Sequence, residues 1–462
     1  MLVLFVAVYE RKGQKMKKRT VAMLLGLMIS VFSVSNAQQP STAGKDSAIA
    51  RAKDFVGHMA KGEHLKCIEF FDSTMKTMMP LEKLRGAWDT LLVRVGPFKG
   101  QLRASSQKYK VYDIVFVTCL FEKDSVDVRV VLNEKKQVAG LFFSRPLAPI
   151  EYKAPSYVKR ETFREEEMLV GSGKWALHGT LTMPKTTEPC PAIVLVHGSG
   201  PNDRDETIGP NKPFRDLAWG LASKGIAVLR YEKRTREHGS ELLALRFTLT
   251  VKEEVIDDAL AAIELLRRTN GIDAHRVYVL GHSLGGMLAP RIGAQDPKVA
   301  GLIMLAGATR PLEDVMVEQI AYLASLSGLS PEQQKGRVEE TEKLRDKVKK
   351  LTKADTSSTE SYFAAPASYW LDLRVYDPPQ VAQSLKMRML ILQGERDYQV
   401  TMKDFERWKS ALQLNSNVSF KTYPKLNHLF VAGEGKSVPA EYEQAGHVQD
   451  DVIDDIAAWL KK

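Results

Sequence analysis

The sequence predicts an α/β protein in which a doubly wound, mostly parallel sheet follows a smaller α+β domain. Two observations lead to this prediction. In the carboxyl-terminal part of the chain, short apolar runs alternate with segments of helical periodicity, which is the pattern of a parallel sheet covered on both faces. Before residue 150, helices come first and a meander of alternating strands follows, which is typical of an α+β domain.

The first 37 residues have the composition of a targeting segment. Met16 begins a basic stretch, an apolar run follows, and small residues end at Ala37. This order is typical of a cleavable secretory signal, with a membrane anchor as the alternative. We expect residues 1–37 to comprise an over-called start and a signal peptide. Cleavage would send the chain to the bacterial periplasm or the medium, without stable membrane insertion afterwards.

Charge and cysteine content exclude several classes of function. The whole chain has a formal charge of +10, but residues 1–37 hold six Lys or Arg and one Glu, which leaves +5. Basicity of this size does not argue for nucleic-acid binding. Cys67, Cys119 and Cys190 are odd in number and lack metal-ligand spacing. We therefore expect buried thiols and no metal site, although a Cys67–Cys119 bridge is an alternative in an oxidising compartment.

The smaller predicted domain spans residues 38–150. Helical periodicity covers 48–71 in two parts, and strands are expected at 109–123, 124–135 and 137–146. Helices followed by an antiparallel meander resemble the cone-shaped α+β domain, similar to nuclear transport factor two, that often precedes secreted hydrolases. We find no convergent acid, base or metal cluster in it, so its expected role is accessory.

The larger predicted domain spans residues 151–462 and begins in a proline-containing linker. Its strands are expected at 165–169, 177–183, 192–196, 227–231, 276–280, 299–305, 388–393 and 418–423. Its helices are expected at 214–224, 250–268, 287–294, 403–412 and 450–460. Residues 308–376 break this alternation and include a charged helical run. Because a long insertion after a sheet strand tends to be a lid, we predict a helical cap there.

A serine between glycines follows one of these strands. Gly281, Ser283 and Gly285 form the pattern G-x-S-x-G, with a strand before it and a helix after it. Such a sharp turn needs glycines, projects the serine Oγ above the sheet and aims the helix amino terminus at a reacting carbonyl. The sequence therefore predicts that Ser283 is a nucleophile. The alternative is a tight turn with an inert serine.

A serine nucleophile needs a histidine base that a carboxylate orients. Asp397 and His428 each follow a predicted strand, in the order that this architecture requires. We prefer Asp397 to Glu395 because the glycine of QGERD begins the turn and leaves the aspartate at its apex; Asp377, which follows the cap, is a further rival. We prefer His428 to His447 because His447 lies in a polar loop beyond the last strand.

The oxyanion of a tetrahedral intermediate needs backbone N–H donors. One donor is expected to be Leu284, directly after the nucleophile. The other is expected in the loop that begins HGSG, where we choose Ser199, with Gly200 as the alternative. His197 is expected to brace this loop, and His282 to point from the elbow into neighbouring structure.

Together the elbow, the HGSG loop and the GERD and NHLF strand ends resemble the α/β-hydrolase superfamily. More narrowly, the loop 197–214 and the following IAVLRYEKRT resemble secreted bacterial carboxylesterases with a small amino-terminal domain. The resemblance covers residues 157–462. It implies hydrolysis of small-molecule carboxylic esters, with short to medium acyl groups, through an acyl-serine and without a cofactor.

The charged residues of the HGSG loop have two interpretations. Asp203, Arg204 and Asp205 form either an internal salt-bridge network or part of the substrate site. In the second case Arg204, or Arg234 and Arg236, would contact a polar or anionic part of the substrate.

The same residues leave two other functions open. A serine peptidase, aminopeptidase or amidase would use the same triad, and the cap offers Glu313, Asp314 and Glu318 to a substrate amine. A non-catalytic binding protein on this fold is the third hypothesis, against which the intact triad argues.

Overall fold

The computed structural model describes residues 42–109, 111–144, 152–242, 248–358 and 360–461. The chain forms two compact units, which divide between Glu151 and Tyr152. The predicted targeting segment, residues 1–37, lies outside the described residues. None of the helices in the described ranges combines the length and the apolar composition that a membrane span needs.

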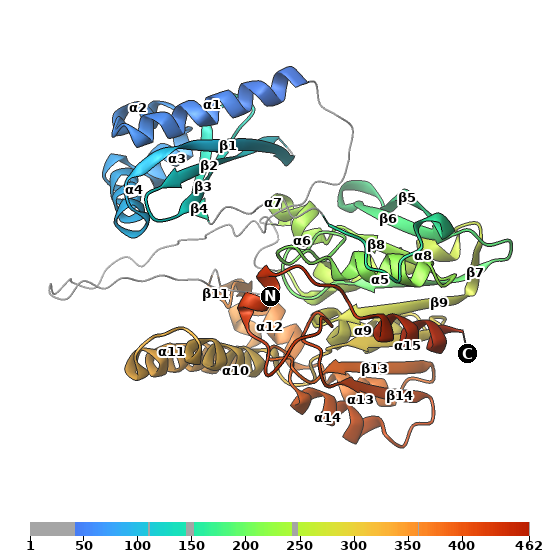
Figure 1. Cartoon of the computed structure of the whole chain (residues 1–462). Helices are drawn as coiled ribbons and strands as arrows, with labels where there is room; N and C mark the ends of the chain where they lie inside the picture. The colour runs from blue at the N-terminus through green and yellow to red at the C-terminus, as the bar shows by residue number, and fades with distance from the viewer. Residues whose placement is uncertain (1–41, 110, 145–151, 243–247, 359, 462) are drawn as a thin grey trace. The chain divides into compact units, whose positions relative to one another are not determined.

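The smaller unit is an antiparallel four-stranded sheet with helices, which confirms the predicted α+β class (Figure 1). Its helices are α1 (Thr42–Ala60), α2 (His64–Glu69), α3 (Ser73–Met78) and α4 (Leu81–Val95). Its strands pair in chain order: β1 (Phe98–Tyr109), β2 (Tyr112–Phe121), β3 (Ser125–Leu132) and β4 (Val138–Ser144).

Three elements of this unit were missing from the prediction. Strand β1 lies at the edge of the sheet, so its sequence FKGQLRASSQKY lacks the apolar alternation of a half-buried strand. Helix α3 has only six residues, which is too short for a periodic signal. Helix α4 does carry such a signal, since Leu84, Trp88, Leu91 and Val95 are its buried residues.

The core of the smaller unit lies between one sheet face and the helices. Alternate β3 residues, such as Val126, Val128 and Val130, belong to the same cluster as α1 residues, as the two-residue period of a strand requires. Cys67 and Cys119 lie in this core as free thiols. Burial raises the pKa of both thiols to about 12, so neither is a reactive thiolate at neutral pH.

The larger unit contains an eight-stranded sheet in the order β14-β13-β10-β9-β7-β8-β6-β5. Only the pairs of β6 with β5 and β8 are antiparallel; the other pairs are parallel. The predicted doubly wound, mostly parallel sheet is therefore confirmed. The strands are β5 (Phe163–Val170), β6 (Leu177–Pro184), β7 (Cys190–Val196), β8 (Ala227–Tyr231), β9 (Ile272–His282), β10 (Gly301–Leu305), β13 (Arg388–Gly394) and β14 (Val418–Tyr423).

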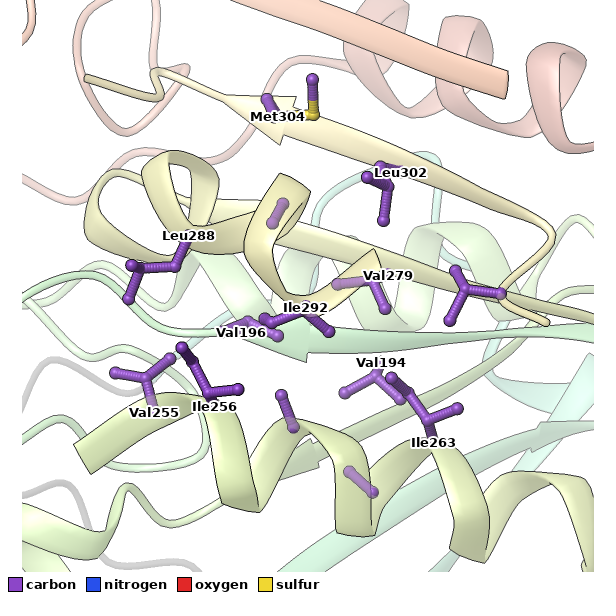
Figure 2. Packing of buried hydrophobic residues seen from close by; sticks show 14 of the residues in the cluster. Val194, Val196, Val255, Ile256, Ile263, Val279, Leu288, Ile292, Leu302 and Met304 are labelled. Atoms are coloured by element: carbon purple, nitrogen blue, oxygen red, sulfur yellow. The ribbon is translucent and has the colours of Figure 1, made fainter. Parts of the chain in front are cut away.

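Helices cover both faces of this sheet. On one face, side chains such as Val194 and Val279 pack against Ile263, Leu288 and Ile292 (Figure 2). The helices of this face are α8 (Asp257–Arg267), α9 (Leu284–Gln295), α13 (Pro378–Gln383) and α14 (Met402–Leu412). On the other face, the alternate strand residues pack against α5 (Pro213–Ala222) and α15 (Asp450–Leu460). Burial on both faces explains the continuous apolar runs of the strands.

The insertion between β10 and β13 is mostly helical. It contains α10 (Leu312–Ser325), α11 (Pro331–Lys350), the short strands β11 (Ser361–Tyr362) and β12 (Ala365–Pro366), and α12 (Ala367–Arg374). The charged run forms α11, which a capping box of Ser330 and Gln333 begins. Helix α10 contacts the loops after β13 and β14, because Gln319 donates to the Gln399 carbonyl and Tyr322 to the Ser437 carbonyl. The insertion thus lies on the carboxyl edge of the sheet.

Candidate active site

Ser283 occupies a sharp turn between β9 and α9. Its φ of 54° is positive, which is rare for a residue with a side chain and persists only where the surroundings hold it. A Cβ at Gly281 would lie 2.1 Å from the Gly285 carbonyl oxygen, and one at Gly285 would lie 2.2 Å from the Val196 carbonyl oxygen. Both glycines of G-x-S-x-G are therefore required for this turn.

Asp397 and His428 meet at the carboxyl edge of the sheet. Asp397 follows β13 and His428 follows β14, and Nδ1 of His428 lies 2.6 Å from Oδ2 of Asp397. The other oxygen, Oδ1, accepts the backbone N–H groups of Gln399 and Val400 at 2.7 and 3.1 Å. These donors hold the carboxylate so that it orients the imidazole.

The nucleophile elbow lies against the histidine loop. His282 is the residue before Ser283, and its ring centroid is 4.7 Å from that of His428. Nε2 of His282 is 2.9 Å from the His428 carbonyl oxygen. The structure thus brings Ser283, Asp397 and His428 to one edge of the sheet.

The buried environment keeps His428 neutral. Burial lowers its pKa, and the charge and hydrogen bond of Asp397 only partly offset this, so the pKa lies below its usual value. Because Nδ1–H donates to the carboxylate, Nε2 carries the free lone pair of the neutral ring. That nitrogen is suited to accept a proton.

The rival acids and base have partners elsewhere. Glu395 accepts from the Thr422 hydroxyl at 2.7 Å, and Asp377 caps α13 through the N–H of Gln380 at 3.1 Å. His447 lies 3.1 Å from Asp216. None of these three residues contacts the Asp397–His428 pair.

Hydrogen bonds fix the HGSG loop at both the N–H and the carbonyl group of Gly198. Its N–H donates to Oε1 of Glu206 at 2.6 Å, and its carbonyl oxygen accepts from Nζ of Lys233 at 2.8 Å and from Asn202 at 3.1 Å. The Gly198 carbonyl and the Ser199 N–H belong to one planar trans peptide and point in opposite directions. Lys233 and Asn202 therefore orient the Ser199 N–H.

Leu284 and the HGSG loop, which carry the two predicted oxyanion donors, lie beside the nucleophile. A Cβ on Gly198 would lie 3.2 Å from that of Ser283, so the loop packs directly against the serine. Leu284 is the first residue of α9, and the first N–H groups of a helix have no acceptor within it. Gly200 has a φ of 96°, a backbone conformation that favours glycine in this turn.

Two sequence comparisons agree with this geometry. Residues 187–435 match the family described as "Serine aminopeptidase, S33". The chain is also 42% identical over 411 residues to a curated relative, "Esterase EstD" of Thermotoga maritima, and the match covers 88% of this chain and 94% of the relative. The chain belongs to this family of α/β-hydrolases. Residues 52–141 of the hydrolase match a second family, described as a protein of unknown function.

Solved structures give more distant similarities to this hydrolase. Est1E from Butyrivibrio proteoclasticus is 16% identical, covers 64% of this chain and 98% of its own, and has a TM-score of 0.41. An esterase of Pyrobaculum calidifontis is 16% identical, covers 64% of this chain and 85% of its own, and has a TM-score of 0.43. The family assignment rests on the sequence matches alone.

The hydrolase holds Arg204 and Arg234 in ion pairs. Arg204 donates to Glu167 and Glu232 at 2.7 and 2.9 Å, and Nε of Arg234 lies 3.0 Å from Asp258. These contacts favour the internal salt-bridge network over substrate contact. The other charged residue, Asp205, pairs with the cations of Lys212, Arg215 and Arg230. Burial alone would raise the pKa of Asp205, but these cations hold it at about 2.

Sequence reasoning missed Glu206 and Lys233. Both side chains are about 2% exposed, although charged residues in a polar loop are normally solvated. The only available signal was the density of opposite charges in the HGSG loop and directly after β8. His197 braces the loop as expected, since it lies 3.0 Å from the Asp203 carbonyl oxygen, and burial lowers its pKa to about 4.

Proposed function

We propose that this hydrolase is an exported bacterial serine esterase. It cleaves carboxylic esters of small molecules, with short to medium acyl groups, through an acyl-enzyme on Ser283. The observation that carries the proposal is the 2.6 Å contact of His428 with Asp397 beside the elbow. The 42% identity to a relative named as an esterase supports the same reaction.

The proposed reaction has two halves. Nε2 of His428 takes the Oγ proton while Ser283 attacks the ester carbonyl, and the N–H groups of Ser199 and Leu284 bind the resulting oxyanion. Collapse breaks the ester bond, and His428 gives its proton to the departing alcohol. Water then attacks the acyl-serine with His428 again as base, which releases the carboxylic acid and restores Ser283.

The charges of the cap support an ester substrate over a peptide with a free amine. An aminopeptidase needs an acidic group for the substrate amine, and the cap was expected to offer three. Asp314 pairs with Lys349 at 2.7 Å, and Glu318 pairs with Arg310 and Lys403. Two of these three carboxylates are thus already neutralised by ion pairs.

A substrate panel tests the reaction class. Nitrophenyl acetate, butyrate and octanoate are compared with aminoacyl nitroanilides on the wild type and on Ser283→Ala. We expect the esters to be cleaved faster than the anilides, with the short chains preferred and all turnover lost in the variant. Faster cleavage of the anilides would favour the peptidase, and activity that survives in Ser283→Ala would contradict the mechanism.

The export part of the proposal rests on residues 1–37. Their basic, apolar and small-residue segments follow one another in the order of a secretory signal. The full chain is expressed in a Gram-negative host and the product is fractionated and sequenced from its amino terminus. We expect a chain that begins after Ala37 outside the cytoplasm, whereas an uncleaved cytoplasmic chain would refute export.

A further inference from the structure

A second histidine–carboxylate pair, His282 with Glu206, lies next to the pair of His428 with Asp397. Nδ1 of His282 is 2.8 Å from Oε2 of Glu206, and Nε2 of His282 is 2.9 Å from the His428 carbonyl oxygen. Glu206 is 2% exposed and His282 is 5% exposed. Because a carbonyl oxygen only accepts hydrogen bonds, Nε2 of His282 carries a proton.

The other ring nitrogen of His282 faces a buried carboxylate. Oε1 of Glu206 accepts the Gly198 N–H at 2.6 Å, as an ionised carboxylate does. Burial opposes both charges, but the mutual attraction and the hydrogen bond outweigh it, so the pKa of Glu206 is lowered and that of His282 is raised. The contacts, together with the directions of the two pKa shifts, favour a carboxylate and an imidazolium.

We propose that Glu206 and His282 are positioning residues, which form a permanent ion pair that ties the Ser199 and His428 loops to the elbow and keeps His428 neutral and ready to accept a proton. This inference rests on the proposed function, since it assigns Ser199 and His428 their roles in ester cleavage.

The Glu206 carboxylate joins separate segments of the chain, which suits a positioning role. Glu206 contacts Gly198 in the HGSG loop and His282 at the end of β9, and His282 extends the chain of bonds to the His428 backbone. Glu206 itself has a φ of 51°, a strained conformation that its neighbours must maintain. A side chain that only served solubility would need neither burial nor strain.

The electrostatic part follows from the short distance between the two rings. A cation whose ring centroid is 4.7 Å from that of His428 disfavours a second positive charge there, and His282 accordingly contributes to the lowered pKa of His428. Asp397, which contacts Nδ1 of His428, acts in the opposite direction.

The other histidine and the tyrosines that face these residues stay neutral. Burial lowers the pKa of His197, which faces Glu206, to about 4. Burial raises the pKa of Tyr398 and Tyr442, which face Asp397, far above neutral pH. Among the groups that the structure describes, protonated His282 is therefore the cation next to His428.

Glu206→Gln separates charge from geometry. The new amide oxygen can accept from Gly198, and its NH₂ can donate to Nδ1 of a neutral His282, whose Nε2–H keeps its bond to the His428 carbonyl. All three hydrogen bonds remain while both charges disappear. A change in the pH dependence of this variant thus reports the ion pair.

The first experiment measures kcat/KM against pH for nitrophenyl butyrate, at a wavelength that is insensitive to nitrophenol ionisation. We expect the acidic limb of Glu206→Gln to move up by about half to one pH unit, because His428 protonates more easily. The matched control is Asp296→Asn, which removes a part-buried carboxylate paired with Arg267 at the far end of α9. Its limb should stay at the wild-type pH.

The inference would be overturned if the acidic limb of kcat/KM stayed at the wild-type pH in Glu206→Gln. It would also be overturned if Asp296→Asn moved the limb equally. A wild type that cleaves no ester would refute the proposed function instead, so the two failures are distinguishable. If Glu206→Gln does not fold, nitrogen-15 NMR of histidine-labelled wild-type enzyme decides. We expect His282, assigned by its loss in His282→Gln, to bear both ring protons at neutral pH, and a neutral tautomer there would overturn the inference.

Discussion

Two histidine–carboxylate pairs stand next to each other in the larger unit and differ in charge. His428 with Asp397 and His282 with Glu206 have similar contacts, 2.6 and 2.8 Å, and both are buried. Yet the pKa of His428 is lowered and that of His282 is raised. The carboxylate alone therefore does not decide whether a buried histidine is a base or a cation.

One difference lies at the second ring nitrogen. In His282 it donates to the His428 carbonyl, which favours the doubly protonated ring. Among the residues that the structure describes, no hydrogen bond joins Nε2 of His428 to another group. One histidine thus serves as a fixed cation, while the other keeps a lone pair for chemistry.

The largest predicted effect is the difference in kcat between variants of the two histidines. His428→Gln removes the base, so kcat should fall by on the order of 10⁴-fold or more. His282→Gln only displaces the loops, for which about 10- to 100-fold is expected. Steady-state kinetics on nitrophenyl butyrate measures both variants, and equal losses would show that the two histidines do not have different roles.

Replacement of the two carboxylates should also lower kcat to different extents, with the larger loss at Asp397. Asp397→Asn leaves Nδ1 of His428 without an anionic acceptor and favours the wrong tautomer, which should cost about 10³- to 10⁴-fold in kcat. Glu206→Gln preserves its hydrogen bonds and should cost less. The comparison is made at the pH optimum of each variant, and a larger loss in Glu206→Gln would contradict the assignment of Asp397 as the orienting acid.

A third buried pair extends the comparison to the other side of Gly198. Lys233 donates to the Gly198 carbonyl and pairs with Glu254 at 2.7 Å. The double variant Lys233→Met/Glu254→Gln leaves no unpaired buried charge. We expect kcat to fall by about 10- to 100-fold with KM nearly unchanged, because the Ser199 N–H loses its orientation.

Glu254→Gln alone is the control for that variant, since it keeps the lysine at the Gly198 carbonyl. Its kcat should stay closer to the wild-type value. A double variant that raises KM and leaves kcat unchanged would mean that Lys233 acts in ground-state binding.

The smallest effect concerns the pH profile of the wild type. Burial holds the pKa of His428 below its usual value, so kcat/KM should rise with pH to a plateau whose acidic midpoint lies below about 6.5. The sign follows because activity requires the neutral ring, which forms as pH rises through this pKa. A midpoint above that value would mean that the charge of Asp397 outweighs burial and the His282 cation.

The meeting of the three proposed triad residues at one sheet edge could be predicted because local sequence determines their places. Ser283, Asp397 and His428 each follow a predicted strand, and parallel strands end at one edge of the sheet. The strands themselves were predictable because burial on both faces leaves continuous apolar runs. Edge strand β1 has no such burial, and its position in the smaller unit could not be read from its composition.

The supporting charges could not be predicted in the same way. Glu206 and Lys233 are buried because they meet His282, Glu254 and Gly198 in space. Such partners lie far away along the chain, so no local pattern distinguishes these residues from solvated ones. The same holds for Arg204, whose two interpretations only its ion pairs could separate.

The most direct test of the central claim is covalent labelling by a fluorophosphonate, followed by peptide mass spectrometry. The reagent reports a serine that its histidine has activated, independently of the natural ester. We predict a single adduct on Ser283, absent in Ser283→Ala, strongly slowed in His428→Gln and retained in His282→Gln. No adduct in the wild type, or one that persists in Ser283→Ala, would contradict the account.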